Sequence, residues 1–353
     1  MDARAHERGS AGPVRLDLSV PPRWRLPLLV LGFASLAFGI AGGLVRLGAA
    51  IPAPAGAIAL HGPLMVSGFL GTVIGLERAV ALGRLWAYAA PLASGLGGVC
   101  LLFGLVVPGF ALMVLAAALL VAASAATFAR QRSLEMATLL AGALAWLAGN
   151  LFLYAGQPAV PWWIAFFALT IGGERLELSR YLKRTPAVRL AFLLIAVLLL
   201  ITPLAPRVMG VVLGLLSLWL LAFDLARVTV RQGGLPRYIA VCLLSGYAWL
   251  ALGGALLAAA SAYDAALHAI FVGFVFSMVF GHAPVILPAV LRVKLPYHPV
   301  LYAPLALLHA SLVVRVFIST SAGAWGNAAA IALFIATAAA LVFSGASSVR
   351  AKR

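Results

Sequence analysis

The sequence predicts an all-α fold: a polytopic membrane helical bundle of about 12 transmembrane helices, with both termini cytoplasmic. Three observations lead to this prediction. Charged residues make up only 10% of the chain and hydrophobic residues 64%, whereas a soluble domain carries roughly 25% charged residues. The apolar residues form runs of about 20, the length that crosses a bilayer. Arginine and lysine alternate between dense and sparse segments along the chain, as the positive-inside rule requires.

Each expected span is an apolar run bounded by Gly, Pro or charged residues. The runs are 25–48, 57–80, 86–107, 109–129, 135–156, 160–179, 188–205, 208–227, 237–260, 265–291, 299–319 and 324–346. The weakest separations are VVPGF (106–110) and TPLAPR (202–207). We therefore expect a cytoplasmic N-terminal tail at 1–24, a twelve-helix membrane domain at 25–348 and a cytoplasmic tail at 349–353.

The basic residues set the expected direction of the spans. With the N-terminus in the cytoplasm, 22 of the 25 Lys and Arg residues fall in cytoplasmic segments, and only Arg46, Arg207 and Arg315 face outside. This bias accounts for the net charge of +16 without a nucleic-acid partner. The expected partner is the lipid bilayer, and the expected location is the cell inner (cytoplasmic) membrane. The arginine-rich N-terminus lacks the apolar region and cleavage site of a signal peptide.

A short internal similarity links two expected cytoplasmic helix ends. IGLERAVALGR (74–84) ends the second span and IGGERLELSRYLKR (171–184) ends the sixth. Each places a Glu-Arg pair where the helix leaves the bilayer. The two stretches are interpreted either as a trace of duplication or as interfacial salt bridges.

Five of the six histidines fall in or beside spans two, ten and eleven. An ionisable group at bilayer depth is costly and is therefore a functional candidate; the alternative is a neutral imidazole hydrogen-bonded between helices. His61 and His268 both lie in the first turns of spans that run from outside to inside. They are expected at the same depth near the outer face, which is what a bis-histidine haem requires.

A second, inner metal site is a further hypothesis. His282 follows His268 by 14 residues in the segment HAIFVGFVFSMVFGH (268–282), about 21 Å of helix and nearly four whole turns. The two therefore share a face but cannot ligate one iron. His309 is expected at a similar depth to His282, and His298 near the inner interface. These three histidines are the candidate ligands for a second metal or haem.

The histidine segments resemble a known family. HGPLMVSGFLGTVIG (61–75), HAIFVGFVFSMVFGH (268–282) and LPYHPVLYAPLALLHASLVVRV (295–316) resemble subunit I of haem–copper oxidases, and more closely the NnrS family of haem- and copper-containing membrane proteins. The resemblance implies a non-covalent b-type haem, with copper as a further candidate. It also implies a role in the response to nitric oxide or another diatomic gas, or in electron transfer to a partner that the sequence does not identify.

The chain departs from the oxidases at the copper centre. Oxidases take copper ligands from spans six and seven and carry His-x-His in span ten, whereas this chain has no histidine in 160–179 or 188–205. A terminal oxidase is therefore not expected. No CxxCH, P-loop, HExxH or GxSxG motif occurs. The alternative function is a multi-span transporter of a small molecule or metal, which the 35 glycines and 20 prolines also suit.

Overall fold

The computed structural model describes residues 20–179 and 184–350, with side chains described as far as residue 344. Within these ranges every regular element is a helix and no strand occurs, which confirms the all-α class. Most of the expected N-terminal tail at 1–24 lies outside the described residues, as do residues 351–353. The first helix begins at Pro22, before the expected boundary, and the last extends to Arg350.

Each expected range overlaps a long helix or a set of consecutive short helices. The long helices are α1 (Pro22–Arg46), α5 (Ala89–Leu102), α6 (Val106–Arg130), α7 (Leu134–Tyr154), α8 (Val160–Leu178), α9 (Pro186–Ile201), α10 (Pro206–Phe223), α12 (Gly234–Ala258), α15 (Tyr302–Phe317) and α16 (Thr320–Arg350). The short pieces η2 (Leu85–Tyr88), α11 (Ala226–Thr229) and η4 (Pro299–Leu301) flank them. Spans two and ten are composite helices: the first is α2 (Ala55–Ala59), α3 (His61–Pro63), η1 (Leu64–Gly71) and α4 (Thr72–Leu82), and the second is α13 (Tyr263–His268), η3 (Ala269–Phe276) and α14 (Ser277–Leu291).

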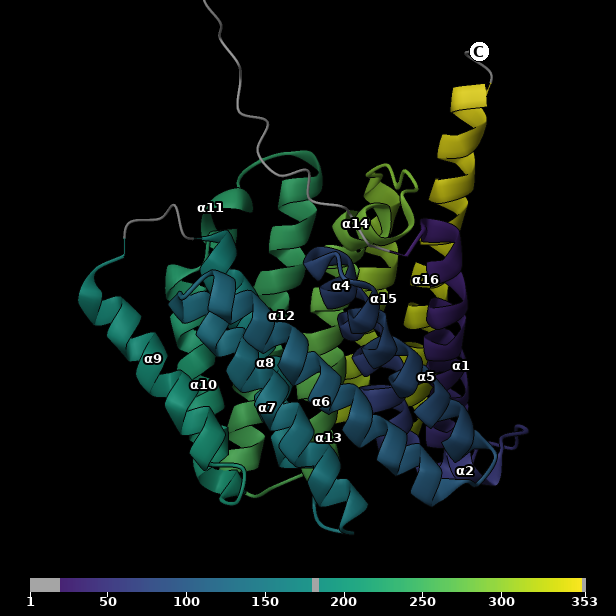
Figure 1. The fold of residues 1–353 in the computed structure, drawn as a ribbon, viewed down its shortest axis with the longest axis horizontal. Helices are drawn as coiled ribbons and strands as arrows, with labels where there is room; N and C mark the ends of the chain where they lie inside the picture. The colour runs from purple at the N-terminus through teal and green to yellow at the C-terminus, as the bar shows by residue number, and fades with distance from the viewer. Residues whose placement is uncertain (1–19, 180–183, 351–353) are drawn as a thin grey trace, which may run out of the picture.

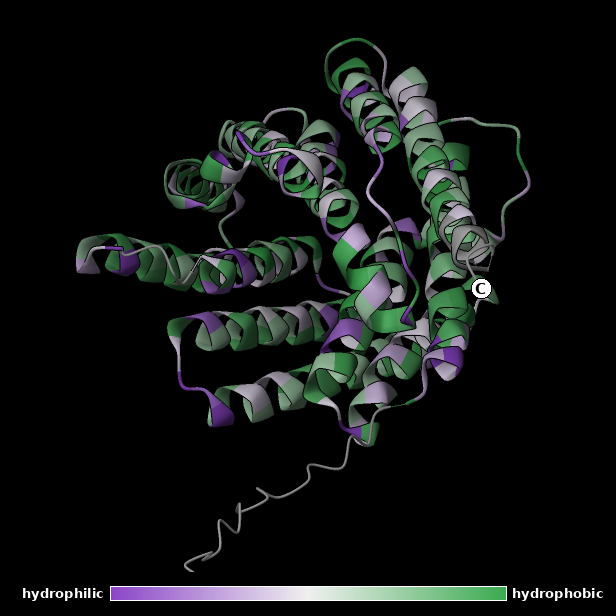
Figure 2. Cartoon of the chain, turned by 90° about the horizontal axis from the view of Figure 1, so that it is seen from above, coloured by the Kyte–Doolittle hydropathy of each residue, from purple (hydrophilic) through white to green (hydrophobic). Residues whose placement is uncertain are grey.

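Ten of the described helical segments are long and apolar enough to cross a membrane. The two expected spans that fall short do so for visible reasons. α8 carries three charged residues near its end, Glu174, Arg175 and Glu177, and α9 has only 16 residues. Large apolar side chains such as Leu194, Val211 and Leu218 point outward from the bundle, and hydrophobic residues lie on the outer faces of most helices (Figure 2). This surface is that of a membrane protein.

Consecutive helices pack side by side and run back and forth, most extensively α5 with α6, α6 with α7, α7 with α8, α10 with α12, and α15 with α16. α1 begins and α16 ends on the same face of the bundle (Figure 1). We call this the terminal face, and the side where α1 ends and α13 begins the opposite face. Bringing both chain ends to one face requires an even number of crossings.

The composite helices and α8 form the interior of the bundle. η1 and η3 are almost wholly buried, with residues such as Val66, Phe69 and Phe274 under 5% exposed. η3 packs against α12, α15 and α8, whereas η1 packs against α1, α5 and α6. A helix that is apolar and buried all round belongs to the core. The two segments that directly follow His61 and His268 therefore lie at the centre of the molecule rather than at its lipid-facing surface.

Candidate functional site

Both composite helices change to π-helix just after their first histidine. His61 begins α3 and is followed within three residues by η1, whereas His268 ends α13 and is followed at once by η3. Each π segment is eight residues long and each returns to α-helix. π-helical turns are rare and occur frequently at functional sites. The same irregularity at the same place marks these two helix ends as a structural pair.

His61 is held against α1. Its Nδ1 lies 2.6 Å from the Gly39 carbonyl oxygen, and because a carbonyl only accepts, Nδ1 carries the proton. The ring also lies against Gly43, where a Cβ would come within 2.9 Å of His61 Cε1. Two glycines of α1 thus provide the hydrogen-bond acceptor and the space that fix the ring. The Nε2 lone pair of His61 is left free for a ligand.

His268 lies in a polar cluster at the opposite face. Its Nδ1 is 2.8 Å from the Asp264 carbonyl oxygen, so this ring too carries its proton on Nδ1. Arg315 Nη2 lies 3.0 Å from Nε2 and 3.3 Å from Nδ1 of His268, and it donates to Asp264 Oδ2 at 3.0 Å. Because Arg315 Nη2 lies at similar distances from both nitrogens of the His268 ring, it lies over the face of that ring. Arg315 itself is 8% exposed.

The structure brings His61 and His268 to the same level. Phe69 and Phe276 each follow their histidine by eight residues, and their rings stack with centroids 6.1 Å apart. Because each histidine precedes its stacked phenylalanine by the same eight residues, the two histidines lie at equal height on neighbouring helices. Each histidine lies within electrostatic range of Arg315 and Asp264, and His61 lies within range of His268. The expected common depth agrees with this arrangement.

The other three candidate histidines separate into two kinds. His282 Nδ1 lies 2.9 Å from the Met278 carbonyl oxygen, so it is protonated there, and its buried Nε2 has no hydrogen-bond partner. His309 Nδ1 instead accepts from Trp249 Nε1 at 3.0 Å, and His298 Nδ1 accepts from the Val300 amide at 3.1 Å as a helix N-cap. In these last two neutral rings the proton is on Nε2, which removes the lone pair that a metal would need there.

No group of three His, Cys, Asp or Glu residues within the described part of the chain is placed to hold a metal ion. The structure therefore does not bring His282, His309 and His298 together as one site. His309 stacks on Trp249, and exposed His298 caps η4. The hypothesis of a three-histidine metal site has no structural support.

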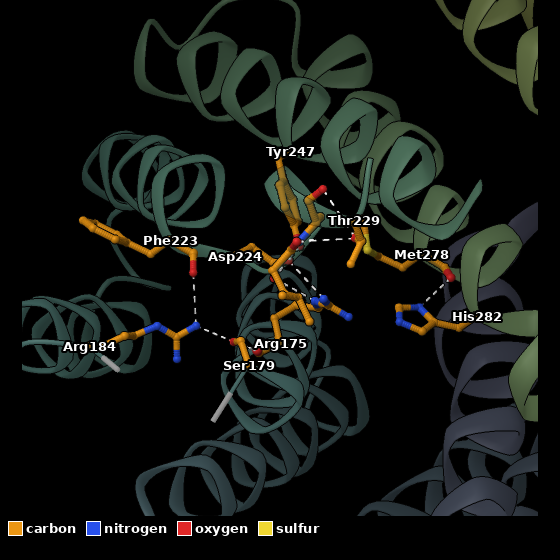
Figure 3. A network of polar contacts seen from close by, with 11 residues as sticks. Arg175, Ser179, Arg184, Phe223, Asp224, Thr229, Tyr247, Met278 and His282 are labelled. Atoms are coloured by element: carbon orange, nitrogen blue, oxygen red, sulfur yellow. Dashed lines mark hydrogen bonds and ion pairs between the residues drawn. The ribbon is translucent and has the colours of Figure 1, made fainter. Parts of the chain in front are cut away.

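A buried ion pair links three helices near the terminal face (Figure 3). Arg175 of α8 donates to Asp224 through Nε at 2.7 Å and Nη2 at 3.0 Å. Asp224, the C-cap of α10, also accepts from the Ala226 amide at 2.6 Å and from the Tyr247 hydroxyl at 3.2 Å. Asp224 and Tyr247 are 0% exposed. Four donors around one carboxylate make this a fully satisfied charge-assisted network.

A second ion pair joins the two similar sequence stretches. Arg78 Nη2, from IGLER, donates to Glu174 Oε1, from IGGER, at 2.7 Å. The interpretation of these residues as salt bridges at helix ends is confirmed for this pair, although the bridge runs between the two stretches. Glu77 makes no hydrogen bond or ion pair with the residues that the structure describes, but it lies within electrostatic range of Glu174.

A cavity of about 520 Å³ lies at the ends of α10 and α12 on the opposite face. It is lined mainly by apolar side chains, with Arg207 and Tyr263 at its polar edge. Tyr263 is the first residue of α13, the helix that carries His268. None of the candidate histidines lines this cavity, so it is separate from the two histidine positions.

Several residues that surround these groups are not identified by sequence reasoning. The basic-residue pattern predicts only that Arg315 faces outside, and it says nothing of Asp224. Their partners are 47 and 49 residues away, respectively. The available signal was the presence of charges inside or at the ends of apolar runs, which require partners when buried. Trp249, which bonds His309, carried no such signal.

The comparisons place the chain in a family. A family model described as Domain of unknown function (DUF8744) matches residues 25–343. The chain belongs to this family. No curated protein and no solved structure matches the chain.

Proposed function

We propose that this chain is a haem-binding membrane protein of twelve spans with its termini in the cytoplasm, in which His61 and His268 are the axial ligands. The single observation that carries the proposal is the common state of the two imidazoles. Each donates Nδ1–H to a backbone carbonyl, and each presents Nε2 at the same level of two adjacent helices. Metal-bound histidines almost always donate their other ring N–H in this way.

The two histidines fit a haem in donor type and charge. Neutral imidazole nitrogens are the usual ligands of low-spin haem iron. Haem also carries two carboxylates, and Arg315 and Arg46 supply positive charge near the His61 position. Binding of iron to His268 requires that the present 3.0 Å contact between Nε2 and Arg315 be given up. With both histidines bound to iron, the haem would supply one-electron chemistry.

Ten of the described helical segments are long and apolar enough to span a membrane. The proposal adds two further spans and assigns the terminal face to the cytoplasm. α8 and α9 complete the set, because α8 is buried in the core and two of its three charged residues, Glu174 and Arg175, are paired near its end. The orientation in the cell inner membrane follows from the bias of Lys and Arg. A role in the response to nitric oxide, or in electron transfer, follows from the resemblance to NnrS, as does copper as a further metal.

The optical spectrum of detergent-purified protein, oxidised and then dithionite-reduced, tests the haem proposal. We expect a Soret band and sharp reduced α and β bands in the wild type. His61→Ala and His268→Ala should each lose the low-spin bands. His298→Ala is the matched control, because this exposed histidine caps a helix away from both ligands. A featureless spectrum, with haem supplied during expression, would overturn the proposal.

One observation favours a transporter as a second candidate. The buried Arg175–Asp224–Tyr247 network places an ionised carboxylate inside the bundle, and carriers use such residues near broken helices. The two π-helical segments are also irregular backbone within the core. Uptake of labelled small molecules or metal ions into vesicles, abolished by Asp224→Asn but not by His61→Ala, would favour transport over haem binding.

A further inference from the structure

One carboxylate near the terminal face has no ion-pair partner within the described residues. We define the inner polar site as Glu77 and Arg78 of α4, Glu174 and Arg175 of α8, Asp224 after α10, and His282 of α14. Arg78 pairs with Glu174 and Arg175 pairs with Asp224, so Glu77 is the carboxylate that remains. A third guanidinium, that of Arg184, lies within electrostatic range of Asp224. A carboxylate without a partner in a membrane interior is costly.

The same site contains an acceptor without a donor. His282 Nε2 is buried and has no hydrogen-bond partner, while its Nδ1–H is held by the Met278 carbonyl. Figure 3 shows the His282 ring directed from α14 towards the Arg175 guanidinium, with no hydrogen bond between them. A buried polar atom with no partner requires an explanation. One proton on Nε2 would remove the unsatisfied lone pair and place a positive charge near these carboxylates.

We propose that the inner polar site binds one exchangeable proton, that His282 Nε2 is its acceptor, and that Glu174 is the carboxylate that stabilises it. Glu174 lies within electrostatic range of both His282 and Glu77. One of its oxygens accepts from Arg78, and no hydrogen bond to the other is formed. Proton uptake needs no ring flip, because Nδ1–H keeps its bond to Met278.

The other groups that face His282 do not compete for this role. Arg175 and Asp224 already form a bidentate pair. Tyr247 donates to Asp224. Cys242 of α12, which lies against Gly281, is a buried thiol. On α4, Arg78 is paired, and Glu77 lies beyond Glu174.

The inner polar site lies close to the terminal face. Arg175 lies in the last turn of α8 and Asp224 ends α10, so both helices end at this level. A cavity of about 10 Å³ lies beside Arg78 and is also lined by Ser124 and Thr170. That volume is about the minimum for one water molecule, which needs two to four polar partners. The proton would therefore enter from the side that we propose to be cytoplasmic.

Nitrogen NMR of protein with ¹⁵N-labelled histidine rings, reconstituted in lipid, tests the proposal with and without haem. His282→Gln assigns the His282 resonances by their disappearance. We expect Nε2 to change from the lone-pair state to the protonated state as the pH is lowered. Glu174→Gln should lower the midpoint of this change by about one pH unit, a tenfold loss of proton affinity. Glu177→Gln, one turn further along α8, is the matched control and should leave the midpoint unchanged.

Several results would overturn the proposal. The first such result is a His282 ring that stays neutral from pH 5 to 8, together with an infrared band of a protonated carboxyl group that disappears in Glu77→Gln. That result would place the proton on Glu77. Alternatively, added Na⁺ or K⁺ at fixed pH could shift the His282 signal, which would make the site a metal-cation site. Because Glu174 is partly exposed, its Gln variant should fold even where His282→Gln does not. The test does not require haem, so failure of the haem proposal leaves it intact.

Discussion

Replacing Asp224 by Asn removes one charge from the buried pair and leaves the shape of the side chain almost unchanged. Arg175 is then left buried, at 5% exposure, without its counter-ion. Breaking a buried pair by removing one partner costs about 3–5 kcal/mol. Because the Asn oxygen can still accept one hydrogen bond, we expect about 3 kcal/mol. At roughly 2 °C per kcal/mol for a chain of this size, the midpoint of thermal unfolding should fall by about 6 °C.

Two further variants calibrate this prediction. The double variant Arg175→Met with Asp224→Asn should recover most of the loss, because removing both charges also removes the desolvation cost. Glu174→Gln breaks the Arg78–Glu174 bridge, whose side chains are 20% and 25% exposed, and should cost about 1 kcal/mol or less. Tryptophan fluorescence in detergent at one scan rate measures all four proteins. If Asp224→Asn costs no more than Glu174→Gln, or if the double variant is no more stable than Asp224→Asn, the account of this pair is refuted.

Three other predictions concern the histidine region, the core and the topology. Gly43→Ala should weaken haem binding about tenfold, because the new Cβ would lie 2.9 Å from His61 Cε1. The haem-to-protein ratio of the purified variant measures this, and Gly214→Ala, where a Cβ would have no neighbouring atom within 4 Å, is the control. An unchanged ratio in Gly43→Ala would contradict the prediction. Asn150→Ala should lower the free energy of unfolding by about 3 kcal/mol, because the Asn150 side chain accepts from Ser67 and Trp163 and donates to the Met113 carbonyl. Thermal unfolding measures this, and a decrease under about 1 kcal/mol would count against the prediction. A membrane-impermeant maleimide added to spheroplasts should label Ala50→Cys and not Gln232→Cys, both exposed in loops on opposite faces, and the reverse pattern would invert the topology.

The helix positions could be predicted because the apolar runs and the basic residues between them are physically direct signals. Each expected range overlaps a helix, but the turn expected at VVPGF (106–110) lies at 103–105, and VVPGF begins α6. The π-helical segments could not be predicted. Inside a uniformly apolar run, the change from α to π geometry is decided by packing against neighbouring helices, and the run carries no pattern that records it.

The candidate site was predictable in position but not in its bonding. Two histidines at corresponding places in two spans of the same direction indicated equal depth, and the Phe69–Phe276 contact agrees with this. The sequence could not indicate which ring nitrogen carries the proton, since this depends on carbonyl oxygens such as that of Gly39, 22 residues away. For the same reason it did not distinguish His282, whose Nδ1 donates to the Met278 carbonyl, from His309, whose Nδ1 accepts from Trp249.

Low-temperature electron paramagnetic resonance of the oxidised, detergent-purified protein tests the central claim most directly. Two imidazole ligands on one ferric haem give a low-spin signal, and this is the result that we predict for the wild type. His61→Ala and His268→Ala should each convert it to a high-spin signal or abolish it, while His309→Ala should leave it unchanged. A high-spin signal in the wild type, or a low-spin signal that survives both ligand variants, would contradict the assignment of His61 and His268 as axial ligands.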